Sequence, residues 1–323
     1  MKILIAPLNW GLGHAARCVP LVRRYLADGN EVVIGGDGES LILLRKSFPQ
    51  LRWVRLAQLN LRYSSSGSQV GAMVKALPQV VRAAIQDHQM VQRLVEVEGF
   101  DLVISDNRFG LYLAGDAKKS TRCIYMTHQL TIAMPRALRW LEPIGRLLHA
   151  IIIKKYDACY VPDFEGPVPG NTALSQGLSG RLGHDGRDAL PHVTYIGPLS
   201  RFSDMPESAM DGAYDMVAVL SGIEPQRTML ENDLINRLTV GRVLLVRGLM
   251  AAPPTVLHHR NITMVPYMDD RSLAIAIRGA TKIFCRSGYS SVMDMYALGV
   301  LTKTEWIPTP GQSEQEYLAD YIR

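Results

Sequence analysis

The sequence has few cysteines and no long apolar run, and both absences limit what the chain can be. Its cysteines are scattered, without the paired spacing of a disulfide framework or a zinc site. No apolar stretch approaches the ~20 residues that a membrane-spanning helix needs. The chain begins directly on a strand pattern over residues 2–6, where a secreted protein would carry a charged leader. We therefore expect a cytoplasmic protein with free thiols at Cys18, Cys123, Cys159 and Cys285.

The composition is that of an ordinary globular protein. Hydrophobic residues make up 47% of the chain and charged residues 20%, which excludes a disordered or fibrous chain. A length of 323 residues exceeds one compact core, so two domains are expected. The net charge is +5, unevenly spread, and no nucleic-acid partner is expected.

One basic segment, residues 136–155, contains Glu142 as its single acid. Its basic residues are interleaved with aliphatic residues and Trp140. A basic helix with a Trp-bearing apolar face can lie on an anionic membrane surface. A core helix whose arginines face solvent fits the same pattern, so both interpretations stay open. The basic residues are Arg136, Arg139, Arg146, Lys154 and Lys155.

Strand and helix patterns alternate along the chain, which predicts an α/β fold with parallel sheets covered by helices. We expect a Rossmann-like domain over residues 1–198, a linker over residues 199–212 and a second Rossmann-like domain over residues 213–323. A periodic pattern predicts a helix over residues 70–98 that Pro78 kinks or divides. Residues 162–191, rich in Gly, Pro and Ser, predict a functional or mobile loop. The predicted strands are residues 2–7, 31–34, 53–56, 102–105, 122–126, 158–161, 193–196, 216–220, 242–246, 261–265 and 282–285.

The most informative segment lies near the C-terminus, where a strand is followed by a turn of small residues and then by a helix. The first N–H groups of a helix have no partner within it, and the helix dipole adds to their pull on an anion. Asp294, two turns into this helix, is placed to meet a ribose hydroxyl, and Gln315 opens the next helix. This layout predicts a sugar-nucleotide site at Arg286, Ser287, Gly288, Tyr289 and Ser290.

These segments resemble the donor-binding half of GT-B glycosyltransferases, and most closely the MurG-like group that uses UDP-N-acetylglucosamine. In that group an Arg-Ser-Gly turn lies at a helix N-terminus, an acidic residue holds the ribose, and a Gln-rich loop meets the donor sugar. Residues 286–288, Asp294 and residues 312–315 match these features. Residues 9–14 are similar to the group's N-terminal glycine-rich loop ending in His. The resemblance covers most of the chain and is poor over residues 130–195.

The resemblance implies two Rossmann-like, doubly wound parallel-sheet domains that face each other across a cleft. In GT-B proteins the last helix crosses back onto the N-terminal domain. Because the sequence stops at Arg323, we expect either that this crossover is absent or that the sequence is a shortened one. Further donor-binding residues implied by the resemblance or by their place at the cleft are Gly13, Ser221, Gly222, Arg227, Arg247, Tyr267, Met268, Gln312, Gln315 and Glu316.

Three residues at strand ends are candidates for acid–base chemistry. His14 follows the first strand at a helix N-terminus, where the dipole disfavours the charged imidazole. A neutral imidazole can take a proton from an attacking sugar hydroxyl. Asp106 ends another predicted strand and competes for this role. His128 resembles part of the family's His-Glu-Gln segment, with Gln129 standing in place of the Glu.

We therefore predict a glycosyltransferase of cell-envelope glycan synthesis. It would transfer a sugar from a nucleotide-sugar donor, best UDP-N-acetylglucosamine or another UDP-hexose, to a glycan or glycolipid acceptor. The resemblance implies inversion and no metal or other cofactor, since helix N-termini and basic side chains stabilise the departing diphosphate. His258-His259 lacks further metal ligands at suitable spacing. An anionic membrane on the cytoplasmic side is a further expected partner.

Three alternatives stay open. Residues 11–16 also fit the dinucleotide pattern GxGxxA, with Asp37 at the spacing of a ribose-binding acid, which would make the chain an NAD enzyme. A UDP-sugar 2-epimerase shares the GT-B fold but needs several carboxylates around the sugar, here Asp106, Asp294 and Glu316. A non-catalytic sugar-nucleotide-binding protein would keep the donor site alone.

Overall fold

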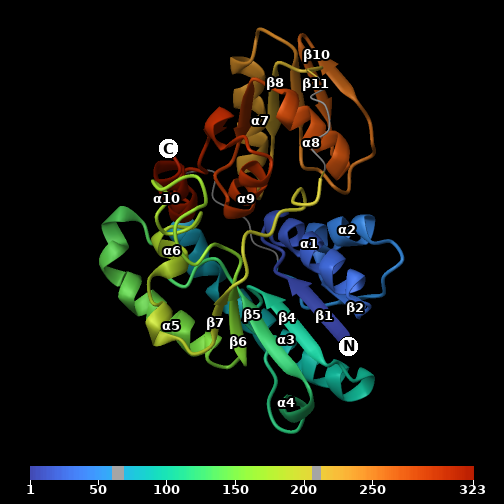
Figure 1. Cartoon of the computed structure of the whole chain (residues 1–323), viewed down its shortest axis with the longest axis vertical. Helices are drawn as coiled ribbons and strands as arrows, with labels where there is room; N and C mark the ends of the chain where they lie inside the picture. Colours follow the sequence, from blue (N-terminus) through green and yellow to red (C-terminus); the bar gives the residue numbers. More distant parts are fainter. Residues whose placement is uncertain (60–68, 206–211) are drawn as a thin grey trace.

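The computed structural model describes residues 1–59, 69–205 and 212–323 and shows two α/β domains (Figure 1). The N-terminal domain is built on a seven-stranded sheet in the order β3-β2-β1-β4-β5-β6-β7, and every neighbouring pair is parallel. This confirms the predicted doubly wound sheet. Its strands are β1 (Lys2–Pro7), β2 (Glu31–Gly36), β3 (Trp53–Arg55), β4 (Leu102–Asp106), β5 (Arg122–Met126), β6 (Ala158–Val161) and β7 (Val193–Tyr195).

The central strand β1 shows why this sheet is buried on both faces. Successive side chains of a strand point to opposite faces. Ile3 and Ile5 therefore pack in one apolar cluster, and Leu4 and Ala6 pack in another on the opposite side. All four are fully buried. The helical segments of this domain are α1 (Gly13–Ala27), α2 (Gly38–Ser47), α3 (Gln69–Glu98), α4 (Ala117–Ser120), η1 (Arg136–Leu141), α5 (Glu142–Ile153), α6 (Arg181–His184) and η2 (Arg187–Ala189).

The C-terminal domain is built on a six-stranded sheet in the order β10-β11-β9-β8-β12-β13. The predicted parallel sheet needs one correction here, because the edge strand β10 runs antiparallel to β11. A tight reversal at Arg260, with a φ of 53°, joins these two strands. The elements are β8 (Met216–Val219), α7 (Gln226–Arg237), β9 (Val243–Val246), β10 (Leu257–His259), β11 (Ile262–Val265), α8 (Asp270–Gly279), β12 (Lys282–Cys285), α9 (Tyr289–Ala297), η3 (Leu301–Lys303), β13 (Thr304–Trp306) and α10 (Ser313–Tyr321).

Two local expectations are narrowed by the structure. Helix α3 continues through Pro78, so the alternative that Pro78 divides it is wrong, since a proline removes one backbone hydrogen bond and a helix can continue past it. Residues 162–191 contain the short segments α6 and η2 and are held at Asp163. The buried Asp163 carboxylate accepts the backbone N–H groups of Leu178 and Ser179, both at 2.8 Å.

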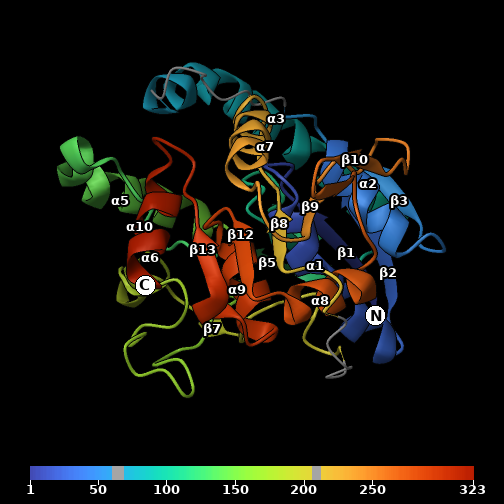
Figure 2. The ribbon, with the colours of Figure 1, turned by 90° about the horizontal axis from the view of Figure 1, so that it is seen from above.

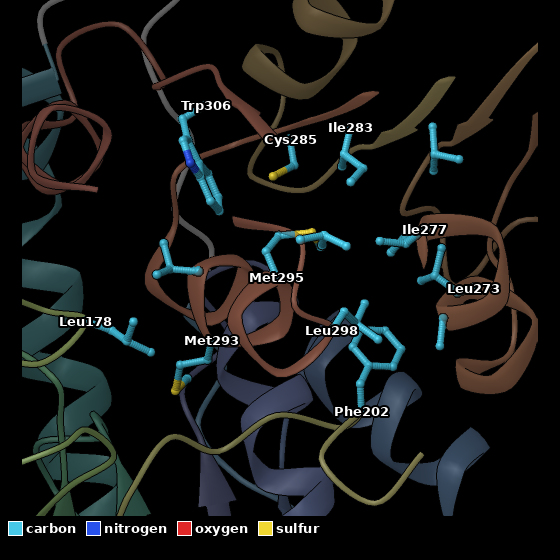
Figure 3. Packing of buried hydrophobic residues seen from close by; sticks show 14 of the residues in the cluster. Leu178, Phe202, Leu273, Ile277, Ile283, Cys285, Met293, Met295, Leu298 and Trp306 are labelled. Atoms are coloured by element: carbon cyan, nitrogen blue, oxygen red, sulfur yellow. The ribbon is translucent and has the colours of Figure 1, made fainter. Parts of the chain in front are cut away.

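The two domains share apolar packing at the linker. Residues 199–205 are the described part of the predicted linker, and residues 206–211 lie outside the described residues. Phe202 from this linker is 1% exposed and lies in the core cluster of the C-terminal domain, together with Leu298 and Trp306 (Figure 3). Leu178 of the N-terminal domain joins the same cluster. The linker therefore fixes one domain on the other through burial of apolar surface.

The last helix, α10, also returns to the N-terminal domain. It lies beside α6 in both ribbon views (Figures 1 and 2). The Tyr317 hydroxyl accepts the backbone N–H of Arg181 at 3.0 Å. The Tyr321 hydroxyl accepts from the N–H of Gln176 at 3.2 Å and donates to the carbonyl of Gly177 at 3.0 Å. This contact positions the segment just before α10 against the N-terminal domain.

Replacing the linker aromatic tests its part in stability. Phe202→Ala removes a fully buried ring and should lower the free energy of unfolding by about 3–5 kcal/mol. The measurement is urea unfolding followed by fluorescence and circular dichroism. Val240→Ala, at a position 74% exposed, is the control and should change stability by less than about 0.5 kcal/mol. Equal small losses in both variants would show that Phe202 does not hold the domain core.

Candidate active site

A cleft of about 660 Å³ lies between the two domains. Strands β1, β4 and β5 of the first sheet and β8, β9 and β12 of the second direct their carboxyl ends toward it. In open α/β sheets this is the edge where ligands bind. The cleft wall includes the β1–α1 turn, the segment after β5, the N-terminus of α9 and residues 311–315. The two segments with the strongest sequence motifs, the turn before α1 and residues 286–315, therefore meet at one site.

The β1–α1 turn touches the N-terminus of α9 directly. The Ser290 hydroxyl donates to the carbonyl of Gly13 at 2.8 Å. A Cβ on Gly13 would lie 2.9 Å from the same hydroxyl oxygen, so this approach requires glycine. Gly11, with a φ of 74°, faces Gly222 of the other domain. Gly13 therefore serves as a close interdomain contact.

This contact argues against the dinucleotide alternative. A pyrophosphate on the glycine-rich turn would need the space above Gly13 that Ser290 occupies. Asp37, the expected ribose ligand of that alternative, is 2% exposed. It is ion-paired with Arg108 at 2.8 Å inside the N-terminal domain. Neither element of an NAD site is free to bind.

A buried ion pair between Asp106 and Arg17 lies beneath His14. Arg17 Nε donates to Asp106 Oδ2 at 2.7 Å, and Arg17 Nη2 also contacts Oδ1. Both side chains are at most 1% exposed. Burial disfavours the charged carboxylate, but Arg17 and His14 outweigh it and hold the pKa of Asp106 well below its usual range. Asp106 therefore stays ionised and is a poor proton acceptor, which favours His14 over Asp106 for the predicted role of base.

His14 is oriented by that carboxylate. Its Nδ1 lies 3.0 Å from Asp106 Oδ1, and its side chain is 14% exposed at the cleft. Nδ1 also lies 3.0 Å from Arg17 Nη2. A hydrogen bond to the carboxylate needs a proton on Nδ1, whereas one from the guanidinium needs a lone pair there. The tautomer that donates from Nδ1 to Asp106 leaves Nε2 unprotonated and able to take a proton. The arrangement keeps His14 as the residue suited to general-base chemistry.

His128 is held differently, and its contacts argue against an acid–base role. Arg17 Nη1 lies 2.8 Å from His128 Nδ1, and a guanidinium can only donate, so Nδ1 accepts. His128 Nε2 then carries the proton and donates to Glu314 Oε1 at 2.7 Å. Burial lowers the pKa of His128, and its ring stacks on Tyr289 at 4.4 Å. Both ring nitrogens of His128 are engaged, so this residue links Arg17 to Glu314.

The predicted anion-binding turn over residues 286–290, here called the anion seat, lies at the cleft wall. Not all of its side chains face the cleft. Gly288, Tyr289 and Ser290 line the cleft at the start of α9. Ser287 turns inward and donates to the carbonyl of Gln315 at 2.7 Å. Arg286 is 4% exposed and donates to backbone carbonyls, including that of Pro308 at 2.9 Å. These contacts favour a structural role for Arg286 over the predicted contact with phosphate, and the proposed seat then depends on backbone N–H groups.

The two other arginines predicted at the diphosphate are engaged by carboxylates. Arg227 is 5% exposed and pairs with Glu224 at 2.6 Å and with Glu231. Arg247 pairs with Glu231 at 2.8 Å. Sequence spacing placed the arginines near the cleft but could not show that Glu231 lies between them. These ion pairs favour a structural role for both arginines over the predicted contacts with phosphate.

The remaining predicted donor residues divide into those that line the cleft and those whose side chains bond the backbone of the loop before α10. Ser221, Gly222, Tyr267, Met268 and Gln312 line the cleft.

Gln315 also reaches the cleft wall, but its Oε1 accepts the Thr309 N–H at 2.8 Å. Glu316 accepts the Gly311 N–H at 2.9 Å. These two side chains shape the 309–312 loop. Glu314, which the sequence reasoning missed, points to His128 instead. Lys46 was missed too, and its Nζ lies 3.7 Å from the centre of the Tyr267 ring.

Asp294 lies at the cleft wall, but linker residues hold its carboxylate. Ser200 Oγ donates to Asp294 Oδ1 at 2.6 Å, and Arg201 Nε lies 3.6 Å from Oδ2. Burial is the main reason that the pKa of Asp294 rises to about 6, and Arg201 and Ser200 only partly oppose it. These contacts favour a role in seating the linker over the predicted contact with a ribose.

The raised pKa predicts how stability changes with pH. Between about pH 4 and 6 the folded chain holds a proton on Asp294 that the unfolded chain releases, so stability falls as pH rises. Relative to Asp294→Asn, the wild type should lose about 3 kcal/mol of unfolding free energy across this window. Urea unfolding at a series of pH values measures it. Asp233→Asn, at an exposed carboxylate, is the control. Parallel curves for wild type and Asp294→Asn would contradict the assignment.

Comparison with known proteins supports the fold. No family model matches the chain. An uncharacterized glycosyltransferase of Methanosarcina acetivorans is 23% identical over 334 residues, covering 98% of this chain and 80% of that protein. Among solved structures, the spinosyn rhamnosyltransferase SpnG aligns with a TM-score of 0.57 at 14% identity, covering 100% of this chain and 91% of SpnG. SpnG has also been solved with thymidine diphosphate.

A second solved structure, MurG of Acinetobacter baumannii, aligns with a TM-score of 0.50 at 12% identity, covering 99% of this chain and 82% of MurG. At such identities these likenesses show the fold alone. The chain thus has the two-domain GT-B fold of known glycosyltransferases, and the prediction of a glycosyltransferase agrees with the name of a relative that aligns along nearly its whole length.

Proposed function

We propose that the chain transfers a sugar from a nucleotide-sugar donor to a hydroxyl of an acceptor, with inversion at the anomeric carbon. The observation that carries this is the position of His14. It stands at the cleft on the buried Asp106 carboxylate, and the N-terminus of α9 lies on the same cleft wall. A base on one domain and an anion seat on the other are the two groups that such a transfer needs.

The chemistry follows from these two groups. The acceptor hydroxyl gives its proton to His14 Nε2 as its oxygen bonds to the anomeric carbon. The bond from that carbon to the diphosphate oxygen breaks, and the electron pair leaves with the diphosphate. Backbone N–H groups at Gly288, Tyr289 and Ser290 receive the growing negative charge. Attack from the side of His14, opposite the leaving group, gives inversion.

A UDP-sugar is the proposed donor, with UDP-N-acetylglucosamine first. The support is the likeness of residues 286–288 and 312–315 to the MurG-like group, together with Tyr267 and Met268 at the cleft, where a base ring would lie. SpnG, which shares the fold, binds thymidine diphosphate, another pyrimidine nucleoside diphosphate. The role of Gln312 at the donor sugar remains part of this proposal.

An epimerase fits the site less well. Epimerisation would need carboxylates that face the sugar. Asp106 is buried against Arg17, Asp294 is held by the linker, and Glu316 bonds the backbone of Gly311. The three candidate carboxylates are thus engaged elsewhere.

The acceptor is proposed to be an amphiphile at an anionic membrane surface. Helix α5 and the preceding η1 present apolar side chains to solvent: Trp140 at 72%, Ile144 at 54%, Leu147 at 62%, Leu148 at 59% and Ile151 at 52% exposed. The opposite face of α5, with Ala150 and Ile153, packs in the core of the N-terminal domain, so the segment is a core-packed helix with an exposed apolar face. Leu148 also lines the cleft, so the apolar surface is continuous with the site. An exposed apolar patch with basic residues around it favours a membrane surface.

Along residues 1–59, 69–205 and 212–323 no helix is long and apolar enough to cross a membrane.

Replacing the base tests the proposed reaction. His14→Gln should lower kcat by a factor of ~100 or more, because a general base is lost. Binding of UDP and the melting temperature should stay close to wild type. Release of UDP and formation of glycoside from a panel of UDP-sugars and hydroxyl acceptors, short-chain glycolipids included, are measured over a pH series. His258→Gln, on the exposed strand β10, is the matched control and should leave turnover unchanged.

The panel also separates the alternatives. A new sugar isomer without free UDP would mean epimerisation, and UDP binding without either product would mean a binding protein. A His14→Gln variant with near-normal turnover would remove His14 as the base. A variant that melts much earlier would make the residue structural.

The membrane part is tested separately by sedimentation with vesicles. The wild type should bind vesicles with anionic lipid in a salt-sensitive way. The double variant Arg136→Glu/Arg139→Glu should bind several-fold more weakly, because each reversal adds repulsion beside the apolar face. Both arginines are exposed, at 95% and 62%.

The control for this test is Arg122→Glu/Arg271→Glu, which reverses two exposed arginines elsewhere. It should sediment as the wild type does. Equal recovery with neutral and anionic vesicles, or none with either, would contradict the membrane proposal while leaving the catalytic one intact.

A further inference from the structure

Glu314, on the C-terminal domain, reaches into the buried charge cluster of the N-terminal domain. It lies in the first turn of α10, and its Oε1 accepts from His128 Nε2 at 2.7 Å. The two residues are separated by 186 positions in the chain. Burial raises the pKa of Glu314, but His128, His14 and Arg17 outweigh it and hold the pKa below its usual value. Glu314 is therefore ionised at neutral pH.

An unbroken chain of hydrogen bonds joins this carboxylate to the base. Glu314 accepts from His128 Nε2, and His128 Nδ1 accepts from Arg17 Nη1 at 2.8 Å. Arg17 then donates to Asp106, and both Asp106 Oδ1 and Arg17 Nη2 lie 3.0 Å from His14 Nδ1. Because a guanidinium donates and a carboxylate accepts, the links from Arg17 to Glu314 place the proton of His128 on Nε2. At His14, the tautomer proposed for the base donates from Nδ1 to Asp106.

The charges in this cluster do not cancel before the reaction. Arg17 carries one positive charge, and Asp106 and Glu314 each carry one negative charge. With both imidazoles neutral, the cluster has a net charge of minus one. Without Glu314 of the C-terminal domain, Arg17 and Asp106 would balance. A proton on His14 would bring the sum to zero. In a site of low dielectric the charge of Glu314 is weakly screened.

We infer that Glu314 is a positioning residue that strengthens His14 as a base through His128 and Arg17. This inference rests on the proposed function and deepens it. Among the described residues, the ionisable groups of the cluster that contains His14 are Asp106 from β4, Arg17 and Cys18 from α1, His128 after β5, Tyr289 from α9 and Glu314 from α10. Among them Glu314 alone lies on the helix that follows the 309–312 loop at the cleft. The strength of the base therefore depends on how the donor domain is seated.

The test is Glu314→Gln, which keeps the acceptor oxygen for His128 and removes the charge. The His14 ring is titrated by NMR on ¹⁵N-histidine-labelled protein, with the signal assigned from His14→Gln. The midpoint should fall by about half a pH unit or more, because a nearby negative charge has been lost. The acid limb of the pH–rate profile should move by the same amount, and the KM for the donor should stay within about twofold. Asp320→Asn, on the exposed side of α10, removes a like charge from the same helix and should move neither.

Two variants of His128 separate the link from the local packing. His128→Gln can accept from Arg17 and donate to Glu314, so the His14 titration midpoint in this variant should stay close to that of the wild type. His128→Phe keeps a ring on Tyr289 but makes neither bond, so it should shift the midpoint as Glu314→Gln does. Melting temperatures show whether either His128 variant fails to fold. If one does, the inference is judged on the Glu314→Gln result.

An unchanged midpoint in Glu314→Gln would overturn the inference. A tenfold rise in donor KM with an unmoved acid limb would also overturn it and make Glu314 a donor contact. The NMR titration needs no turnover. If the midpoint moves but the wild type transfers no sugar, the link stands and the proposed function fails.

Discussion

The site depends on the buried ion pair between Arg17 and Asp106. Both side chains are almost fully excluded from water, and a buried charge persists only when it is paired and hydrogen-bonded. Arg17 keeps Asp106 ionised, and both members of the pair lie 3.0 Å from Nδ1 of His14. The same guanidinium fixes His128. Removing Arg17 would leave a buried carboxylate uncompensated, a loss of about 3–5 kcal/mol by comparison with other buried pairs.

The cleft is defined by contacts that cross between the domains. Ser290 meets Gly13, Glu314 meets His128, and Phe202 of the linker enters the C-terminal core. The first two involve residues that also line the cleft. The same groups that shape the proposed donor seat therefore hold the loop that bears His14, the proposed base.

Much of the fold could be predicted from the sequence, because strand periodicity and small-residue turns are local signals. The glycine-rich turn with His14 and the turn before α9 were found in this way. Arg17 and Glu314 were not, since their partners lie 89 and 186 positions away. Arg227, Arg247 and Arg286 were predicted as phosphate ligands for the same reason: the sequence shows a cation but not the carboxylate or carbonyls that engage it.

The account is tested most directly by the protonation of the two imidazoles. A long-range ¹H–¹⁵N correlation spectrum of histidine-labelled protein at neutral pH distinguishes the ring nitrogens. We predict His14 protonated on Nδ1 with Nε2 free, and His128 protonated on Nε2 with Nδ1 accepting from Arg17. A proton on Nε2 of His14 in the neutral ring would leave it no lone pair toward the cleft, and would contradict its assignment as the base.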